Sequence, residues 1–497
     1  MSGHRDVGVP AEKSSRILSR RKILQQTAWL VAAAPFARGT GMAEQPVSPV
    51  MDKLSMYMSV ARNRTLPDEV VEKAKHHILD TFAAMVSGSD LSPGRAAIRF
   101  AREYGGERVS TVVASPVLCG AIEAAITNAE LAHSDETDDY YAYAWLGAHP
   151  GCSIVPAALA LGEQSGIDGM EFLRAVVLGY DVGIRVVSAL GPEALIKETH
   201  NMVATFGSAA AGGSAADLNA QQMRWLLDYA AQQSGSGIFA WRRDTEHMEK
   251  AFVFAGAGAR NGVTAALLVK AGWTGVNDIL SGPDNFFQAY SPKADPAGLI
   301  DKLGERYEVT RTNIKKWTVG GPIQAALDAL DNLLKRHPFE ADQVQQVVVR
   351  VYTSGAATVN GREMPDICLQ HMIAVMLMDK TVSFRAAHDR DRMQDPLILR
   401  QRAKVQLVPD EELERQMPRR EAIVEVTLAD GTHLTDHVEA VRGTTENPMT
   451  RDEVVAKARD LMTPVLGPTN CTKLIAKLLG LDDAKDIREL RPLLQRA

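Results

Sequence analysis

Hydrophobic residues recur every three or four positions from about residue 47 to about residue 300, and alternation of period two is scarce. This spacing predicts amphipathic helices. One helix is expected to begin at Pro67, where acidic residues follow the proline and lysines come later. Small residues dominate three further segments that are predicted to be closely packed helices: 155–160, 206–216 and 262–268. We therefore expect an all-helical domain over residues 47–312.

The pattern changes after residue 312. Segments 344–352 and 420–428 predict strands, and Asp430-Gly431 indicates a hairpin turn to a returning strand at 434–441. Helical spacing returns within this region at 321–336 and 369–378. Residues 313–446 are thus predicted to form a smaller α+β lid domain. The chain becomes helical again after residue 447, so residues 447–497 are expected to complete the first domain. The predicted fold class is mainly α.

The N-terminus has the pattern of an export signal. Arg20-Arg21 precedes a short apolar stretch at 28–34, and Gly41-Met42-Ala43 offers small residues for a signal peptidase. A twin arginine before a short, weakly apolar segment is typical of a Tat signal. Residues 1–43 are therefore predicted to be a Tat-type signal peptide. The mature protein is expected in the periplasm without a membrane anchor, or in the cytoplasm if the leader is not functional.

Composition narrows the class of protein. The net charge of −6 and the lack of long basic runs argue against nucleic acid as a partner. The four cysteines are far apart, so a zinc finger or an iron–sulfur cluster is not indicated. Segment 256–262 is rich in glycine, but Asn261 stands where a dinucleotide-binding loop needs its third glycine. Close helix packing is the better interpretation, and no metal or organic cofactor is predicted.

Chemistry is concentrated in segment 133–141, His-Ser-Asp-Glu-Thr-Asp-Asp-Tyr-Tyr, which is followed by His149-Pro150-Gly151. Such an acidic loop is often only solvated surface. Between apolar helices, however, crowded carboxylates raise some pKa values and hold imidazoles in one tautomer, which suits acid–base catalysis. Four other segments supply candidate groups: His200 before a small-residue helix, Lys250 after His247, the pair Lys315-Lys316 near the predicted domain junction, and His371 within an apolar helix.

Taken in order, these segments resemble the MmgE/PrpD family over nearly all of the chain after residue 47. The family's A-H-A-L-D-F-D-D-T-H motif and its H-P-G are similar to segments 132–141 and 149–151. Its G-Y-E-V, G-F-T-G and E-N-P-L-T motifs are similar to segments 179–182, 272–275 and 446–450. The departures are local: Glu136 stands for an aspartate, Tyr140 for a threonine and Phe254 for a histidine.

The resemblance implies a helical domain with an α+β lid, a homodimer, no cofactor, and an active site between the two domains. It implies catalytic roles for His149, His200, Lys315, His371 and Asp139. It implies substrate-binding roles for Asp135, Glu136, Asp138, Tyr140, Lys250 and Lys316. His149 is the expected main acid–base group, Lys315 or Lys316 is expected to hold a carboxylate, and His371 takes the place of a family tyrosine.

The implied function is a cofactor-independent lyase, of the dehydratase or decarboxylase type, that acts on a small carboxylate. One alternative is an isomerase or epimerase, in which His149 works with His371 or Lys250 on opposite faces of one carbon. A second alternative is a periplasmic binding protein without activity, because the family's K-R-L-H-A-G motif is degraded around Lys250 and Phe254.

Overall fold

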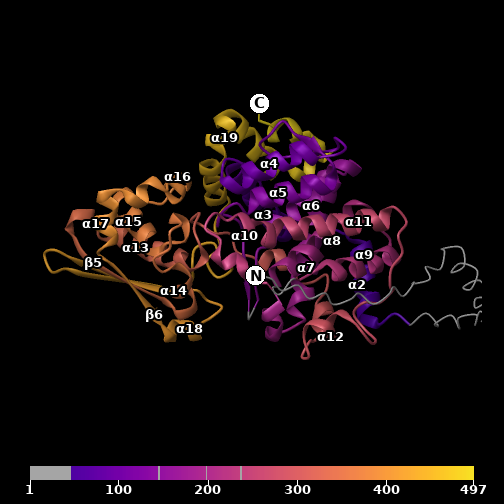
Figure 1. The fold of residues 1–497 in the computed structure, drawn as a ribbon, viewed down its shortest axis with the longest axis horizontal. Coiled ribbons are helices and arrows are strands. Elements are labelled where there is room, and N and C mark those ends of the chain that lie inside the picture. The colour runs from indigo at the N-terminus through magenta and orange to yellow at the C-terminus, as the bar shows by residue number, and fades with distance from the viewer. Residues whose placement is uncertain (1–45, 144–145, 198, 236–237, 497) are drawn as a thin grey trace, which may run out of the picture. The chain divides into compact units, whose positions relative to one another are not determined.

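The computed structural model describes residues 46–143, 146–197, 199–235 and 238–496. The predicted signal peptide lies outside these residues. Residues Val47–Ala497 form one compact unit. This unit is mainly helical, with small sheets, as the sequence predicts (Figure 1).

Helices form most of the chain between residues 47 and 312. The longer ones are α2 (Pro49–Ser59), α3 (Asp68–Gly88), α4 (Ser92–Tyr104), α5 (Ala121–Ala132), α6 (Gly151–Ser165), α7 (Gly169–Ser188), α8 (Thr199–Ala215), α9 (Ala220–Gln233) and α11 (Ala257–Lys270). Shorter elements are α10 (Met248–Ala251), the π-helical turn η4 (Phe252–Gly256) and α12 (Phe286–Tyr290). Two short strand pairs interrupt the helices: β1 (Ser110–Thr111) with β2 (Leu118–Cys119), and β3 (Tyr141–Tyr143) with β4 (Leu146–Ala148).

The small-residue helices pack closely, as predicted. Helix α8 packs against α6, α7 and α11. A Cβ atom at Gly258 or Gly262 of α11 would overlap Ala204 or Ala209 of α8, so the glycines allow the two backbones to approach. Segment 256–262 is therefore part of a helix–helix contact rather than a nucleotide-binding loop. The continuous segment Met248–Lys270 is long and apolar enough to span a membrane, but 67% of its most apolar window is buried inside the protein, as in a core helix.

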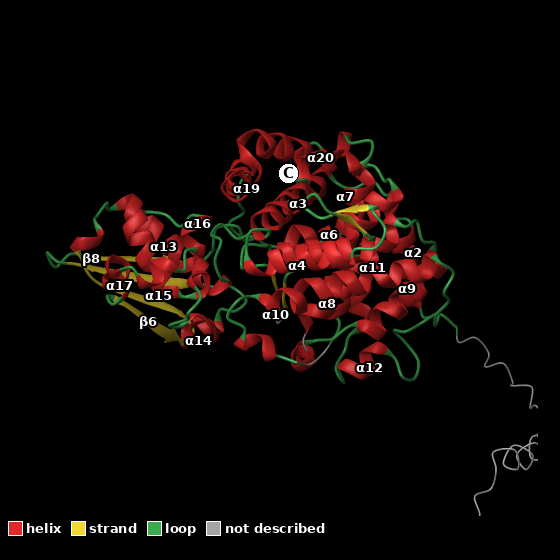
Figure 2. Cartoon of the chain, turned by 45° about the horizontal axis from the view of Figure 1, so that its top comes forward, coloured by secondary structure: helices red, strands yellow, loops and turns green. Residues whose placement is uncertain are grey.

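The predicted α+β segment contains one four-stranded sheet (Figure 2). Its strands are β5 (Val344–Tyr352), β6 (Val405–Asp410), β7 (Ala422–Leu428) and β8 (His433–Val438), in the order β6-β5-β7-β8. Strand β6 is parallel to β5, whereas β7 is antiparallel to both β5 and β8. Its helices are α13 (Gln324–Arg336), α14 (Thr353–Val359), α15 (Leu369–Asp379), α16 (Phe384–His388), α17 (Pro396–Arg402) and α18 (Glu411–Arg415).

The last segment is the long, kinked helix α19 (Arg451–Leu479), followed by α20 (Arg491–Leu494). Helix α19 packs on α3, so segments far apart in the sequence lie side by side. Short 3-10 turns connect the helices: η1 (Ala61–Asn63), η2 (Pro192–Lys197), η3 (Ala240–Arg243), η5 (Pro296–Ile300), η6 (Glu308–Arg311), η7 (Gly321–Ile323), η8 (Ala341–Gln343), η9 (Pro365–Ile367), η10 (Asp391–Gln394), η11 (Leu481–Asp483) and η12 (Ile487–Leu490).

The buried hydrophobic residues fall into two clusters. One joins residues between Met51 and Ile314 with residues between Met449 and Leu494. The other contains residues between Trp317 and Val441 and fills the space between the sheet and its helices. The domain boundaries given above stay a prediction, since the chain from Val47 onward forms one unit.

Candidate active site

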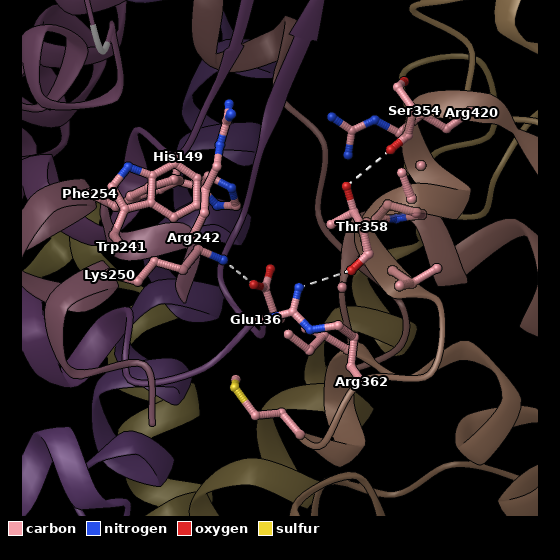
Figure 3. A pocket seen from close by; sticks show the side chains of 18 of the residues that line it. Glu136, His149, Trp241, Arg242, Lys250, Phe254, Ser354, Thr358, Arg362 and Arg420 are labelled. Atoms are coloured by element: carbon pink, nitrogen blue, oxygen red, sulfur yellow. Dashed lines mark hydrogen bonds and ion pairs between the residues drawn. The ribbon is translucent and has the colours of Figure 1, made fainter. Parts of the chain in front are cut away.

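A cavity of about 740 Å³ lies between side chains that precede residue 260 and side chains that follow residue 314. Figure 3 shows His149, Trp241, Lys250 and Phe254 on one side of it, Ser354, Thr358, Arg362 and Arg420 on the other, and Glu136 between them. Five of the predicted site residues line this cavity: Glu136, His149, His200, Lys250 and Lys315. The structure therefore brings together groups that are up to 179 positions apart in the sequence.

One carboxylate orients two histidines at this cavity. Oδ2 of Asp138 lies 3.0 Å from Nδ1 of His133 and 3.2 Å from Nδ1 of His149. Burial would raise the pKa of Asp138, but its interactions with His133, His149 and Lys315 outweigh burial and hold that pKa well below its usual range. An ionised Asp138 can only accept, so both Nδ1 atoms donate. The Nε2 atom of His149 is then the unprotonated, basic atom.

His149 is neutral near pH 7. Burial lowers the pKa of His149 to about 4, and the charge of Lys315 acts in the same direction, while Asp138 opposes them. An imidazole with this pKa is available as a base throughout the neutral range. His149 lies two residues before the start of α6, and the backbone N–H of Gly151 in the first turn of that helix donates to Oδ1 of Asp139 at 2.9 Å. The acidic segment thus fixes the start of the helix that follows His149.

Lys315 is a buried ammonium group that also lines the cavity. The backbones of Tyr140 and Asn313 exchange two hydrogen bonds, which dock the segment that carries Lys315 onto the acidic segment. Nζ of Lys315 donates to the backbone oxygen of Glu136 at 2.6 Å and lies 3.6 Å from Oδ1 of Asp138. Burial would lower the pKa of Lys315, but Asp138, Glu136 and a further aspartate outweigh it and raise that pKa. The group is therefore a fixed positive charge rather than a base.

Glu136 and Lys250 form an ion pair inside the cavity (Figure 3). Burial opposes ionisation of Glu136, but the charges of Lys250 and Lys315 lower its pKa well below the usual range. Nε2 of His247 lies 4.0 Å from Oε1 of Glu136 and 3.4 Å from Oδ2 of Asp366. Both lysines at the cavity are consequently held by carboxylates of the chain itself.

An aromatic wall completes the histidine side of the cavity. The ring of His200 stacks on Phe254 with 4.0 Å between the ring centres, and Trp241 meets Phe254 edge-on at 4.7 Å. Phe254 belongs to the π-helical turn η4, which is inserted between α10 and α11. Such turns are frequent at functional sites. The phenylalanine that replaces a family histidine therefore makes this wall apolar.

Three predicted site residues lie close to the cavity but do not line it among the described residues. Asp138 acts through the histidines, as described above. The ring of Tyr140 lies beneath Lys315, with 5.9 Å between Nζ and the ring centre. Asp135 is paired with Nε2 of His388 at 2.8 Å, and its carboxylate is used in that contact.

Three further predicted site residues lie elsewhere. Asp139 is fully buried behind the site and accepts from Tyr180 at 2.6 Å and pairs with His77 at 2.7 Å. Lys316 turns away from the cavity and pairs with Asp331 at 2.9 Å. His371 is fully buried in α15, within the second hydrophobic cluster, and it does not line the cavity. The resemblance placed these residues by alignment alone, and side-chain direction differs from one position to the next along each segment.

Most residues that line the cavity are not among the predicted site residues, and His247, Trp241, Arg362 and Arg420 are four of them. In the sequence, His247 stands out only as a neighbour of Lys250. The arginines carry no motif, and the sequence pattern places Arg420 at the start of a predicted strand. Strand β7 begins at Ala422, which pairs with Val351, so the sheet places Arg420 beside the end of β5.

Side chains of His133, Asp138 and His149 offer three potential metal ligands within 4.8 Å of one another. A divalent ion there would have to displace the Nδ1 protons that Asp138 accepts. It would also lie near Lys315, whose Nζ is 3.6 Å from Asp138. The positive charge of this lysine disfavours a second cation, and the group is better suited to proton transfer than to metal binding.

The fold and the cavity define a class of protein that is mainly helical and that gathers histidines, lysines and carboxylates at one cavity. Comparison with known protein families identifies the family. The model of the MmgE/PrpD N-terminal domain matches residues 52–298, and that of the C-terminal domain matches residues 317–481. The chain belongs to the MmgE/PrpD family.

Several curated proteins are similar to this chain over most of its length. A cis-aconitate decarboxylase-like protein of Aspergillus oryzae is 25% identical over 90% of this chain and 98% of its own length. The cis-aconitate decarboxylase of Homo sapiens is 25% identical over 86% of this chain and 91% of its own. The cis-aconitate decarboxylase of Aspergillus terreus is 24% identical over 90% of this chain and 96% of its own length. These relatives support a lyase-type enzyme.

Proposed function

We propose that this chain is a lyase that acts on a small acid with more than one carboxylate, by dehydration or decarboxylation, without a metal or organic cofactor. One observation carries the proposal: a neutral histidine, oriented by a buried aspartate, lies at the same cavity as a buried ammonium group. His149 is the acid–base group and Lys315 binds the carboxylate next to the reacting carbon. The relatives named above support this class of reaction.

Dehydration uses these groups in one sequence. Nε2 of His149 takes the proton from the carbon next to the carboxylate, and the electron pair of the C–H bond moves toward that carboxylate. The fixed charge of Lys315 stabilises the negative charge that develops there. The pair then forms the carbon–carbon double bond as the hydroxyl group leaves. The proton that His149 took is passed to this hydroxyl group, so that water is the second product and His149 is neutral again.

Decarboxylation uses the same two groups, but His149 donates a proton to carbon instead of accepting one. The bond to the departing carboxylate breaks, carbon dioxide leaves, and the electron pair stays on carbon. A protonated His149 then donates its proton to that carbon. The pKa of about 4 favours the reaction in which His149 begins as the base, which is dehydration. The names of the relatives favour decarboxylation, and product analysis decides between the two.

The experiment uses the purified chain with citrate, 2-methylcitrate and cis-aconitate, followed by proton NMR and by release of carbon dioxide. We expect His149→Ala to lower kcat/KM by at least ~100-fold, the lower range for loss of an acid–base group. His337→Ala is the matched control, because His337 is exposed on the surface and should have no effect. Wild-type turnover by His149→Ala would refute the assignment of His149.

The same assay in deuterated water tests the reaction class. Deuterium uptake at one carbon without loss of any group would contradict a lyase and identify an epimerase. Binding without any change of the ligand would contradict an enzyme of either kind. The epimerase that pairs His149 with His371 is disfavoured already, because His371 does not line the cavity.

A further inference from the structure

Arg420 differs from the two lysines at the cavity. Each of Lys250 and Lys315 lies within 4.0 Å of a carboxylate of the chain. Among the described residues, no carboxylate lies within 4.0 Å of the guanidinium of Arg420, and its Nε is buried without a hydrogen-bond partner. Keeping a charged group away from water without a partner is costly, so such a group is suited to an anion that arrives from outside.

The side chain of Arg420 is held in place from two sides. Its guanidinium carbon lies 4.9 Å from the centre of the Tyr140 ring, a cation–π contact. A Cβ atom at position 321 would overlap Nη1, so Gly321 leaves the room that the guanidinium occupies. Gly321 and Arg420 both line the cavity, and Figure 3 shows Arg420 on the wall opposite His149. The group is positioned before any ligand binds.

Arg420 and Lys315 contact the same aromatic ring. Nζ of Lys315 lies 5.9 Å from the centre of the Tyr140 ring, and the guanidinium carbon of Arg420 lies 4.9 Å from it. The two cations are therefore within reach of one small molecule. A guanidinium binds a carboxylate through two parallel hydrogen bonds, whereas an ammonium acts as a point charge.

We propose that Arg420 binds a second carboxylate of the substrate, remote from the reacting carbon, while Lys315 binds the first. The residue thus selects acids with at least two carboxylates over monocarboxylates. This inference rests on the proposed function, because Lys315 is assigned there to the reacting end of the substrate. It assigns to Arg420 substrate binding and specificity, with no part in proton transfer.

The experiment measures the affinity of the full chain for three unreactive probes: tricarballylate, glutarate and butyrate. Calorimetry is done on the wild type, Arg420→Gln and Arg420→Lys. Loss of a charged hydrogen-bonding partner corresponds to about 10- to 100-fold in affinity. We expect Arg420→Gln to weaken tricarballylate and glutarate by that factor and to leave butyrate unchanged. Arg420→Lys should recover part of the affinity, because it keeps the charge without the two parallel donors.

Arg419→Gln is the matched control, since Arg419 is the exposed neighbour and should bind all three probes like the wild type. Circular dichroism establishes that each variant is folded. Equal weakening of all three probes, or unchanged affinity for the two larger acids, would overturn the role of Arg420. If the wild type binds none of the probes, the inference and the proposed function both fail.

The two ideas can also fail separately. Selective weakening in Arg420→Gln, together with a wild type that converts none of the reactive acids, would support the role of Arg420 and contradict the lyase. Turnover by the wild type with unchanged binding in Arg420→Gln would do the reverse.

Discussion

His371 tests how far alignment alone can place a catalytic residue. The family resemblance puts it in the active site, whereas the structure buries it in α15, away from the cavity. Neither ring nitrogen has a hydrogen-bond partner among the described residues. We therefore predict that His371→Phe keeps wild-type turnover and changes stability in a pH-dependent way.

The size of the pH-dependent change in the free energy of unfolding follows from the pKa of the His371 imidazole. Burial lowers the pKa of His371 to about 4, Arg402 and Arg392 act in the same direction, and Asp389 opposes them. The ordinary value is about 6.5. Between these two pH values the unfolded chain binds a proton that the folded chain does not bind. Stability therefore falls as the pH falls from about 6.5 to about 4, by about 3 kcal/mol in total.

The assay is urea unfolding of the wild type and His371→Phe at about pH 8 and about pH 4.5, a span that covers most of this titration. The free energy of unfolding of the variant should depend less on pH than that of the wild type, by about 2–3 kcal/mol. Phenylalanine keeps the aromatic volume, and His337→Phe at an exposed site is the control. Identical pH dependence in the wild type and His371→Phe, or a ~100-fold loss of turnover, would refute the reasoning.

Three other predictions concern Asp138, the two adjacent lysines Lys315 and Lys316, and the predicted signal peptide. Asp138→Asn should lower kcat/KM by about 10²- to 10⁴-fold. It should also shift the acid limb of the pH profile of kcat/KM to lower pH, because Asp138 raises the pKa of His149. An unshifted acid limb would contradict this role of Asp138. Lys315→Met should lower kcat/KM by about 10- to 100-fold, whereas Lys316→Met should not; equal losses would show that the two lysines are not distinguished. Replacing both arginines of the 20–21 pair by lysine should leave unprocessed precursor in the cytoplasm, and mature periplasmic protein in fractionated cells would contradict a Tat signal.

Regular elements could be predicted well because their patterns are local. Strand β5 has the predicted bounds, and the hairpin of β7 and β8 turns at Asp430-Gly431, where Gly431 has a φ of 88°. Strand β6 was missed because it is short, only partly buried and without alternation. The pairs β1–β2 and β3–β4 were missed for the same reason, since two or three residues carry no period.

The site could be predicted only in part because it depends on side-chain direction. Motifs and their order single out His149 and Lys315, and both residues line the cavity. They did not separate Lys315 from Lys316, because adjacent residues in an extended segment point to opposite sides. Arg420 carried no signal at all, since its place depends on the pairing of Ala422 with Val351 and on the room left by Gly321.

The four carboxylates of the acidic segment show why such a loop is buried rather than solvated. Each has its own set of partners, although Lys315 lies near both Glu136 and Asp138. Asp135 pairs with His388, Glu136 with Lys250, Asp138 with the imidazole of His149 and with Lys315, and Asp139 with His77.

These pairings offset the repulsion between the four carboxylates. Four adjacent anions would repel one another in a buried loop, but each lies against a cation or a hydrogen-bond donor instead. Burial lowers the pKa of His388, yet the contact with Asp135 outweighs burial and raises it to about 9, so that pair stays charged at neutral pH. Because its neighbours are compensated by other groups, Asp138 keeps its charge for His149 and Lys315. Removing one outer pair, for example by His388→Ala, should therefore disturb stability before it disturbs proton transfer.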